Sequence, residues 1–486
     1  MNLPKDFKNY FLSHWNEEDV EALIRGLEAE PAVSIRINPR RLPLDAEPEG
    51  ADGRVPWCPE GFYLKQRPQF TADPLLHAGA YYVQEASSMF LAHVIRSLFP
   101  SASEGSDTEN PPLSCALDLC AAPGGKSTLL RSLLPDDCLL ISNEPNRARC
   151  QVLAENLAKW GLPNVLVTQA YPADLAGELS GGRVSLILAD VPCSGEGMMR
   201  KEEEASRQWS PDFVAECAAM QRSIISDIWP VLAPGGILIY STCTFNPEED
   251  ENNVEWIARE LGADLLSIPI DPAWHIRGDL RRLSPNNSSS FQRFNISPPT
   301  PLPGEGSGVG FLPCYHFLPG QVRGEGFFLA VLRKHGAVPS TTSPAVLATV
   351  PDGSSSGHRR LKKKDRRAAS SSPSSSPSLI ILPTSQLDSP LDNKPEAPSP
   401  SLGGQGCIYP RVNLSLADSL RYLQRESLIL TPDTPRGIVQ VCFRGQRLGL
   451  MNNLGTRANN LYPKEWRIRS THLIPHTLFY NKESAP

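Results

Sequence analysis

The sequence predicts an α/β fold with a doubly wound, parallel sheet between about residues 113 and 335. Short, continuously apolar segments recur there, as expected of strands that are buried on both faces. Amphipathic helical patterns alternate with these segments, and such alternation is typical of strand-helix-strand units. A small N-terminal α+β domain and a small C-terminal, mainly β domain complete the expected fold.

The expected elements of the central domain follow one another along the chain. The first strand covers 116–119 and leads to a helix that begins at Ser127, and the second covers 139–141 and leads to a helix over 146–160. Two later helices begin with a good capping residue before a proline, at Ser210 and at Asn246. Further strands are expected over 165–167, 186–189, 236–240 and 327–332.

The length of 486 residues exceeds what one hydrophobic core usually supports. A segment rich in serine and proline separates two parts that have the composition of ordinary globular domains. Its own composition predicts a disordered linker. Within it, the basic run 359–367 would either attract a polyphosphate backbone or act as a solvated tether, and 297–310 is predicted to be a long surface loop. The expected parts are 1–112, 113–335, 336–406 and 407–486.

Several classes of protein are disfavoured by composition. No apolar stretch approaches the roughly 18 residues of a membrane span, and the first residues lack a leader pattern, so we expect a cytoplasmic protein without membrane contact. Eleven scattered cysteines without a Cys-x-x-Cys pair predict reduced thiols and no metal. The net charge of −6 argues weakly against a nucleic-acid partner, but local basic clusters decide such binding.

A glycine-containing turn over 118–127 follows the first expected strand and opens a helix. Its small residues let backbone amides approach a ligand at the positive end of that helix. A phosphate-cradling loop would need glycine where Cys120 stands, and the dinucleotide pattern Gly-x-Gly-x-x-Gly is absent. Glu144 follows the second strand, where an acid binds ribose hydroxyls in many α/β nucleotide sites.

Two cysteines each follow directly on an apolar strand. Cys193 comes three residues after Asp190, and Cys243 follows the strand over 236–240. Because the carboxyl ends of parallel strands meet at one edge of a sheet, we expect both thiols and the carboxylate there. A thiolate is a strong nucleophile, which suggests covalent chemistry at this edge.

Three long motifs occur in one order, over 118–126, 190–198 and 241–252, and with them the chain strongly resembles the Nol/Nop/Sun (Fmu-type) family of RNA cytosine-C5 methyltransferases. The resemblance extends over about residues 1–335. Beyond the linker, 445–449 and 457–467 look like the extension of the RsmF-like subgroup, which modifies small-subunit ribosomal RNA.

This resemblance implies a class I S-adenosylmethionine-dependent methyltransferase with a Rossmann-like doubly wound sheet. It also implies an RNA substrate, most simply 16S rRNA or the small ribosomal subunit, with no obligate protein partner. Cys243 would add to cytosine C6, Cys193 would assist release of the product, and Asp190 would hydrogen-bond near N3. The residues expected to bind S-adenosylmethionine are Cys120, Ala121, Ala122, Pro123, Gly124, Gly125, Lys126, Glu144, Arg149 and Asp190.

The chain departs from the family pattern at three positions. Tyr171 stands where an acid usually contacts adenine, although Asp174 is near enough in sequence to replace it. Val191 replaces alanine, and Gly320 stands where histidine is common. Three alternatives follow: a tRNA methyltransferase, a non-catalytic ribosome-assembly factor, and a nucleotide hydrolase suggested by residues 125–127.

Some side chains outside these motifs are candidates for RNA contact. In that role the aromatic rings would stack on an unpaired base and the basic groups would hold phosphates, although a core role is the simpler interpretation of each aromatic residue. In the C-terminal part, basic and aromatic residues interleave in a mixture that suits single-stranded RNA. The candidates are Trp57, Trp209, Phe245, Arg36, Arg200 and Lys201, and then Arg457, Tyr462, Lys464, Trp466, Arg467 and Arg469.

Overall fold

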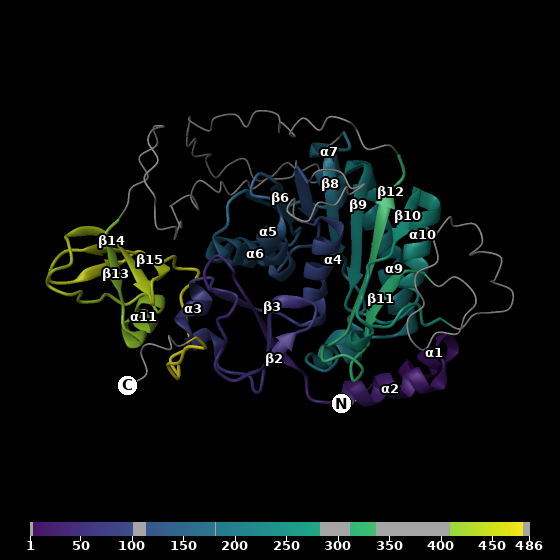
Figure 1. Cartoon of the computed structure of the whole chain (residues 1–486), viewed down its shortest axis with the longest axis horizontal. Coiled ribbons are helices and arrows are strands. Elements are labelled where there is room, and N and C mark those ends of the chain that lie inside the picture. The colour runs from purple at the N-terminus through teal and green to yellow at the C-terminus, as the bar shows by residue number, and fades with distance from the viewer. Residues whose placement is uncertain (1–2, 101–112, 180, 282–311, 337–408, 480–486) are drawn as a thin grey trace, which may run out of the picture.

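The computed structural model describes residues 3–100, 113–179, 181–281, 312–336 and 409–479 (Figure 1). The described residues form three sheets, one in each of the three expected folded parts. The predicted surface loop at 297–310, the basic run at 359–367 and nearly all of the predicted linker lie outside the described residues.

The N-terminal part is an α+β unit, as the sequence predicts. Its sheet has the order β2-β3-β1-β4 with antiparallel pairing throughout. Helix α2 has good amphipathic spacing, and Asn16 caps it by accepting a hydrogen bond from the amide of Asp19 at 2.9 Å. The elements are α1 (Phe7–His14), α2 (Glu17–Glu28), β1 (Val33–Ile37), β2 (Ala51–Val55), β3 (Cys58–Leu64), α3 (Pro74–His77), β4 (Tyr81–Val83) and α4 (Phe90–Leu98).

The central sheet has eight strands and contains the predicted parallel core. Strands β7, β6, β5, β8 and β9 lie side by side and are all parallel. The strands are β5 (Cys115–Asp118), β6 (Leu139–Asn143), β7 (Val165–Thr168), β8 (Val184–Asp190), β9 (Leu232–Thr242), β10 (Ala263–Leu266), β11 (Cys314–Phe317) and β12 (Phe327–Lys334).

Strand β12 corrects the expectation of a wholly parallel sheet. It lies between β9 and β10 and runs antiparallel to both. The chain enters β12 from its antiparallel partner β11 rather than through a crossover helix, and a parallel neighbour would require such a crossover. The apolar run over 327–332 identified the strand but carried no information about its direction.

Helices cover both faces of the central sheet, which makes it doubly wound (Figure 1). Successive residues of one strand enter opposite cores: Leu140 packs with Leu153 of α6, and Ile141 packs with Ile225 of α9. No helix among the described residues has the length and apolar character needed to cross a bilayer. The helices are α5 (Gly125–Leu133), α6 (Arg147–Trp160), α7 (Pro172–Glu178), α8 (Glu203–Gln208), α9 (Pro211–Ile228) and α10 (Glu251–Leu261).

The two capping predictions had different outcomes. Ser210 caps α9 by accepting a hydrogen bond from the amide of Phe213 at 3.1 Å, as expected. Helix α10 begins only at Glu251, although Asn246 does accept from the amide of Glu249 at 2.9 Å. In the intervening turn the Tyr240 hydroxyl donates to the Glu249 carbonyl at 2.7 Å, and Asp250 before the helix has a non-helical ψ of −95°.

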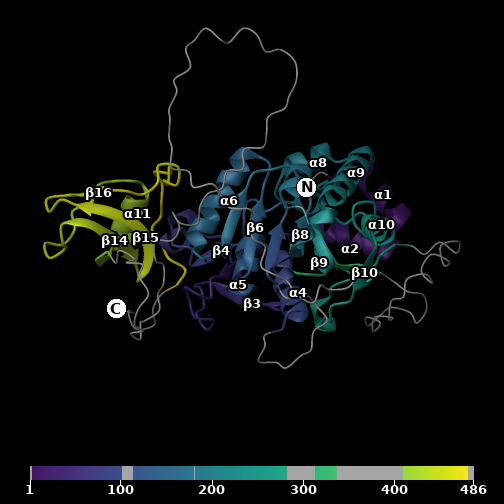
Figure 2. The same ribbon diagram turned by 90° about the horizontal axis from the view of Figure 1, so that it is seen from above.

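The C-terminal part is a small β domain that packs against the N-terminal part. Both views show it at one end of the molecule (Figures 1 and 2). Its Tyr422 and Val439 share one hydrophobic cluster with Ile35 and Phe62 of the N-terminal sheet. The elements are β13 (Arg411–Asn413), α11 (Leu416–Leu423), β14 (Gly437–Phe443), β15 (Gln446–Asn453) and β16 (Ala458–Asn460), in sheet order β13-β14-β15-β16.

A close backbone contact joins the N-terminal part to helix α6. Gly79 has a φ of +67°, and a Cβ there would lie 1.8 Å from the carbonyl oxygen of Lys159. The Asn38 side-chain amide donates to the carbonyls of Gly79 at 3.0 Å and Trp160 at 3.1 Å. This contact positions the N-terminal sheet beside the central domain.

Replacing Gly79 by alanine is therefore expected to destabilise the protein. Left-handed backbone costs an L residue about 1–2 kcal/mol, and forcing a methyl group against a fixed backbone adds roughly 1–3 kcal/mol. The matched control is Gly53→Ala, where φ is +93° but nothing lies within 4 Å of the new Cβ. Thermal melting should show a clearly larger loss for Gly79→Ala, and equal losses would contradict the close contact.

The pH dependence of stability should depend on Asp118 at the end of β5. Ser127 donates to one carboxylate oxygen at 2.6 Å, and burial raises the pKa of Asp118 to about 7. The unfolded chain ionises near pH ~3.9, so native stability is lost as the pH rises from about 4 through 7. Asp118→Asn keeps an acceptor for Ser127 and cannot ionise, so its stability relative to wild type should increase over that range. Parallel unfolding curves from pH 5 to 8 would refute this.

Candidate active site

The glycine-containing turn lies between β5 and α5, as predicted. Gly124 has a φ of +113°, and a Cβ there would come within 3.3 Å of the Leu153 side chain, so both the conformation and the approach of α6 favour glycine. Helix α5 begins at Gly125, two residues before the predicted start. Its first amides have no partners within the helix and face the end of the turn, where a polar ligand could accept from them.

Glu144 lies beside this turn and is almost fully buried. One of its oxygens accepts from the amide of Asn146 at 2.9 Å, and the other lies 3.4 Å from the Arg149 guanidinium. Arg149 also donates to the carbonyl of Ala122 at 2.9 Å. The arginine therefore ties the turn to the carboxylate, which keeps acceptor capacity for a ligand hydroxyl.

The departures from the family pattern have different structural settings. The Tyr171 side chain is 68% exposed just before α7, and Asp174 is exposed in the first turn of that helix. Val191 is buried among apolar residues. Gly320 has a φ of +84°, and a Cβ there would lie 2.8 Å from the Cα of Gly26 in α2. Close packing on α2 therefore explains why Gly320 lacks a side chain.

The two cysteines lie together at the carboxyl ends of β8 and β9. These strands are parallel neighbours, with Asp190 paired to Ser241, and the sulfur atoms of Cys193 and Cys243 are 3.2 Å apart. Both residues are partly exposed. The hydrogen bond to Cys243 and the enclosure of its sulfur hold the pKa of Cys193 well above its usual range, so Cys193 keeps its proton at neutral pH.

Asp190 and Lys126 form an ion pair beside the thiols. The Lys126 ammonium lies 2.8 Å from one carboxylate oxygen, and the Ser241 hydroxyl donates to the other at 2.8 Å. Burial opposes the charge on Lys126, but the neighbouring Asp190 outweighs burial and raises the pKa of the ammonium group. Cys243 also favours the charged form of Lys126, which places a stable cation in the field of the thiol pair.

Two buried glutamates connect the loops that carry the thiols, and sequence reasoning did not assign them a role. Glu196 accepts from the amide of Phe245 at 2.7 Å and from the Trp209 indole at 2.8 Å. Glu249 accepts from the amide of Ser194 at 3.0 Å, and burial raises its pKa to about 7. Both acids lie within the motifs that carry the resemblance, and that position was the only signal for them in the sequence.

Several candidates for RNA contact are instead part of the core. The side chains of Trp57, Trp209 and Phe245 are buried, as a core role requires. Arg36 is only 2% exposed and donates to Gln84 and Thr128, so the expectation of a phosphate contact there is wrong. Arg200 is similarly buried against Glu325, and Lys201 lies 3.2 Å from the same carboxylate.

The C-terminal candidates divide into buried and exposed groups. Tyr462 is buried and Trp466 is half-buried, so these rings pack within the domain. The exposed C-terminal candidates are all basic, so their side chains are accessible to a partner. They are Arg457, Lys464, Arg467 and Arg469.

One group of described residues has side chains of the type that bind metals. Atoms of Glu251, Cys314 and His316 lie within 4.8 Å of one another in the interior. His316 already bonds to Glu251 at 3.0 Å, and this contact lowers the pKa of the glutamate against the effect of burial. This hydrogen-bonded contact accounts for the arrangement, and the absence of a metal stays a prediction.

Three family models match the chain in the order of its three folded parts. The N-terminal domain of 16S rRNA methyltransferase RsmF matches residues 3–86, the 16S rRNA methyltransferase RsmB/F model matches 110–333, and the methyltransferase RsmF PUA domain matches 409–468. The matches together include all three sheets.

Curated relatives agree with these models. The ribosomal RNA small subunit methyltransferase F of Cronobacter sakazakii is 33% identical over 64% of this chain and 58% of its own length. The enzyme of the same name from Aeromonas salmonicida is 33% identical over 63% and 59%, respectively. The matched segment thus spans less than two thirds of these relatives.

Solved structures support the fold. NSun6 from Pyrococcus horikoshii, solved with SFG, is 20% identical with a TM-score of 0.50 over 68% of this chain and 98% of that one. PH0851 is 20% identical with a TM-score of 0.53 over 68% and 66%. The expected class I S-adenosylmethionine-dependent methyltransferase fold is confirmed. Residues 110–333 are thus similar to the RsmB/F methyltransferases, and the parts before and after them are similar to the N-terminal and PUA domains of RsmF.

Proposed function

We propose that this protein methylates C5 of a cytosine in 16S rRNA through a covalent bond between Cys243 and C6 of the base. The observation that carries the proposal is the thiol pair, with sulfur atoms 3.2 Å apart, next to the ion pair of Asp190 and Lys126. The names of the matched relatives and of the PUA domain support ribosomal RNA as the substrate.

The residues around the glycine-containing turn fit S-adenosylmethionine. Glu144 can accept from ribose hydroxyls, the first amides of α5 can meet the polar tail, and the small residues 120–125 leave room for close approach. Asp118 has a buried carboxylate oxygen without a hydrogen-bond partner among the described residues. When bound, this cofactor supplies a methyl group on a sulfonium, which a carbon nucleophile can attack.

The cysteines and the carboxylate would make such a nucleophile from cytosine. The Cys243 thiolate adds to C6 while N3 takes a proton from water, and Asp190 accepts a hydrogen bond from the new N3–H, so that the π electrons of the C5–C6 bond become available at C5. After C5 is methylated, water accepts the C5 proton, the bond between sulfur and C6 breaks as N3 gives up its proton, and the aromatic ring returns with Cys243 again a thiolate. Cys193 keeps its own proton and donates a hydrogen bond to the departing sulfur of Cys243.

Removing either thiol should have a distinct effect. Cys243→Ala should abolish methyl transfer because no adduct can form, whereas Cys193→Ala should accumulate an RNA adduct that survives a denaturing gel. Bisulfite sequencing of 16S rRNA and tRNA from gene-deleted cells that carry each variant measures the transfer. Cys217→Ala removes a buried thiol of α9 and should remain active.

The outcomes distinguish the possible errors. Full methylation by Cys243→Ala would refute the assignment of the nucleophile. A mark that depends on Cys243 but lies in tRNA would keep the chemistry and refute the ribosomal substrate. Absence of any mark in RNA from wild-type cells would refute the proposed function.

The charge of Lys126 should be needed for fast methyl transfer. The ammonium group pairs with Asp190 at 2.8 Å, and Cys243 also favours its charged form, so Lys126→Gln removes a cation beside both reacting groups. Single-turnover rates at saturating cofactor should then fall roughly tenfold. An unchanged rate would contradict a role for this cation in the reaction.

A further inference from the structure

The two faces of the N-terminal sheet carry different side chains. Strand β1 pairs with β4 so that Arg36 lies directly opposite Tyr82, and such partners share one face of a sheet. Gln84 comes two residues after Tyr82 and follows on the same side. Ile35 and Tyr81 lie on the other face, in the hydrophobic cluster that includes the C-terminal domain. The apolar face is thus used for the C-terminal domain, and the polar face is left for the central domain.

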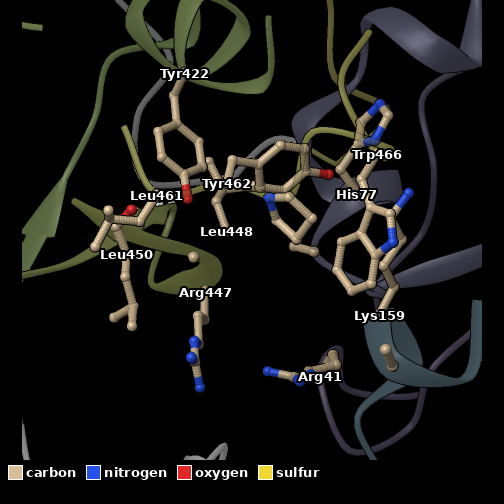
Figure 3. Close-up of a pocket in the computed structure, with 14 residues that line it drawn as sticks. Arg41, His77, Lys159, Tyr422, Arg447, Leu448, Leu450, Leu461, Tyr462 and Trp466 are labelled. Carbon is tan, nitrogen blue, oxygen red and sulfur yellow. Dashed lines mark hydrogen bonds between the residues drawn. The ribbon is translucent and has the colours of Figure 1, made fainter. Parts of the chain in front are cut away.

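A pocket of about 240 Å³ lies at the seam between the N-terminal part, helix α6 and the C-terminal domain (Figure 3). Lys159 of α6 and Tyr422 and Tyr462 of the C-terminal domain contribute to its wall. Neither Arg36 nor Tyr82 is among the described residues that line it, and no residue of the glycine-containing turn is. The contact that Arg36 and Tyr82 make with the central domain is therefore separate from this pocket.

Arg36 donates hydrogen bonds to the first turn of α5, although the two belong to different parts of the chain. Its Nη2 lies 2.6 Å from the Thr128 hydroxyl oxygen and 3.2 Å from the carbonyl oxygen of Gly125. The Thr128 hydroxyl itself donates to the same Gly125 carbonyl at 2.9 Å. Hydrogen bonds from a charged donor are stronger than neutral ones, so a buried guanidinium holds the first residue of the helix.

Further contacts fix the orientation of this guanidinium. Its Nε donates to the side-chain oxygen of Gln84 at 2.8 Å, and its Cζ lies 4.5 Å from the centre of the Trp160 ring in α6. Gln84 in turn donates to the Ser88 hydroxyl at 3.2 Å. Burial lowers the pKa of Arg36 to about 10, so the group still carries its charge at neutral pH. With partners on both sides, the planar group is a rigid link between the N-terminal sheet and α5.

Tyr82 contacts the residues just before this helix. Its hydroxyl donates to the Pro123 carbonyl at 3.3 Å, and Asn156 of α6 donates to the same carbonyl at 2.8 Å. The ring packs so closely that a Cβ on Gly125 would lie 3.3 Å from its Cε1 atom. The N-terminal part thus holds the carbonyl groups of Pro123 and Gly125, on either side of the left-handed Gly124.

We propose that Arg36 is a positioning residue for the methyl donor. A peptide unit is planar, so a fixed Gly125 carbonyl also fixes the amide of Lys126 that follows it. The amides of this first turn are the groups that meet the polar tail of S-adenosylmethionine. Arg36 therefore acts on the cofactor through the turn, without touching it. The inference rests on the proposed function for the place of the cofactor.

Calorimetric titration of the full-length protein with S-adenosylmethionine, without RNA and below each melting transition, tests this role. Arg36→Lys keeps the charge but cannot bridge Gln84 and Thr128 with one planar group, so the dissociation constant should rise roughly tenfold. Arg131→Lys is the matched control, because Arg131 is also buried but donates to the Leu134 carbonyl at 2.9 Å, at the far end of α5. This control should lower the melting temperature and keep the wild-type dissociation constant.

The Thr128 hydroxyl gives a second test that leaves Arg36 in place. Thr128→Val keeps the shape of the side chain but removes the hydroxyl between Arg36 and Gly125, so cofactor binding should weaken several-fold. Thr128→Ser keeps the hydroxyl and should bind as the wild type does. In methylation assays, the KM for the cofactor should rise in Arg36→Lys and Thr128→Val while kcat stays near the wild-type value.

Wild-type cofactor affinity in both Arg36→Lys and Thr128→Val would overturn the positioning role, and so would an equal loss of affinity in Arg131→Lys. If Arg36→Lys does not fold, the two Thr128 variants decide, and equal affinity in both of them would overturn the role. Failure of the wild-type protein to bind S-adenosylmethionine would refute the proposed function instead, so the two failures are distinguishable.

Discussion

The register between β8 and β9 is the constraint on which the proposed chemistry depends. Pairing of Asp190 with Ser241 places both following loops at the same edge of the sheet and brings the two sulfur atoms to 3.2 Å. A shift of one residue would turn the side chains at the ends of these strands to the opposite face. The register is firmly set because the strands are buried on both faces between two hydrophobic cores.

The strand register does not by itself fix the loops that carry the two cysteines. Hydrogen bonds to two buried glutamates also hold these loops. Glu196 and Glu249 each accept a hydrogen bond from a backbone amide of the opposite loop, at Phe245 and Ser194, so the two loops that carry the cysteines are tied to each other. Their mutual repulsion contributes to the raised pKa of Glu249, after the larger effect of burial. Such an arrangement costs stability but fixes reacting groups, which is the usual relation between a functional site and its supporting residues.

The sequence identified the parallel core, the turn at Gly124 and the two thiols, because each depends on a local pattern or on strand ends meeting at one edge. It failed where a distant partner decides the outcome. Arg36 and Arg200 read as free cations, yet Gln84, Thr128 and Glu325 bind them from other parts of the fold. The sequence likewise could not predict that β12 runs antiparallel to β9, because an apolar run has the same pattern in either direction. The glycine at position 320 is explained by its close contact with α2, which lies far away in the sequence.

Contacts between residues distant in the sequence also join the N-terminal and C-terminal parts of the chain. Tyr422 and Val439 share a core with the first sheet, and the Asp73 carboxylate accepts from the amide of Leu478 at 2.9 Å, so segments from opposite ends of the chain form one packed unit.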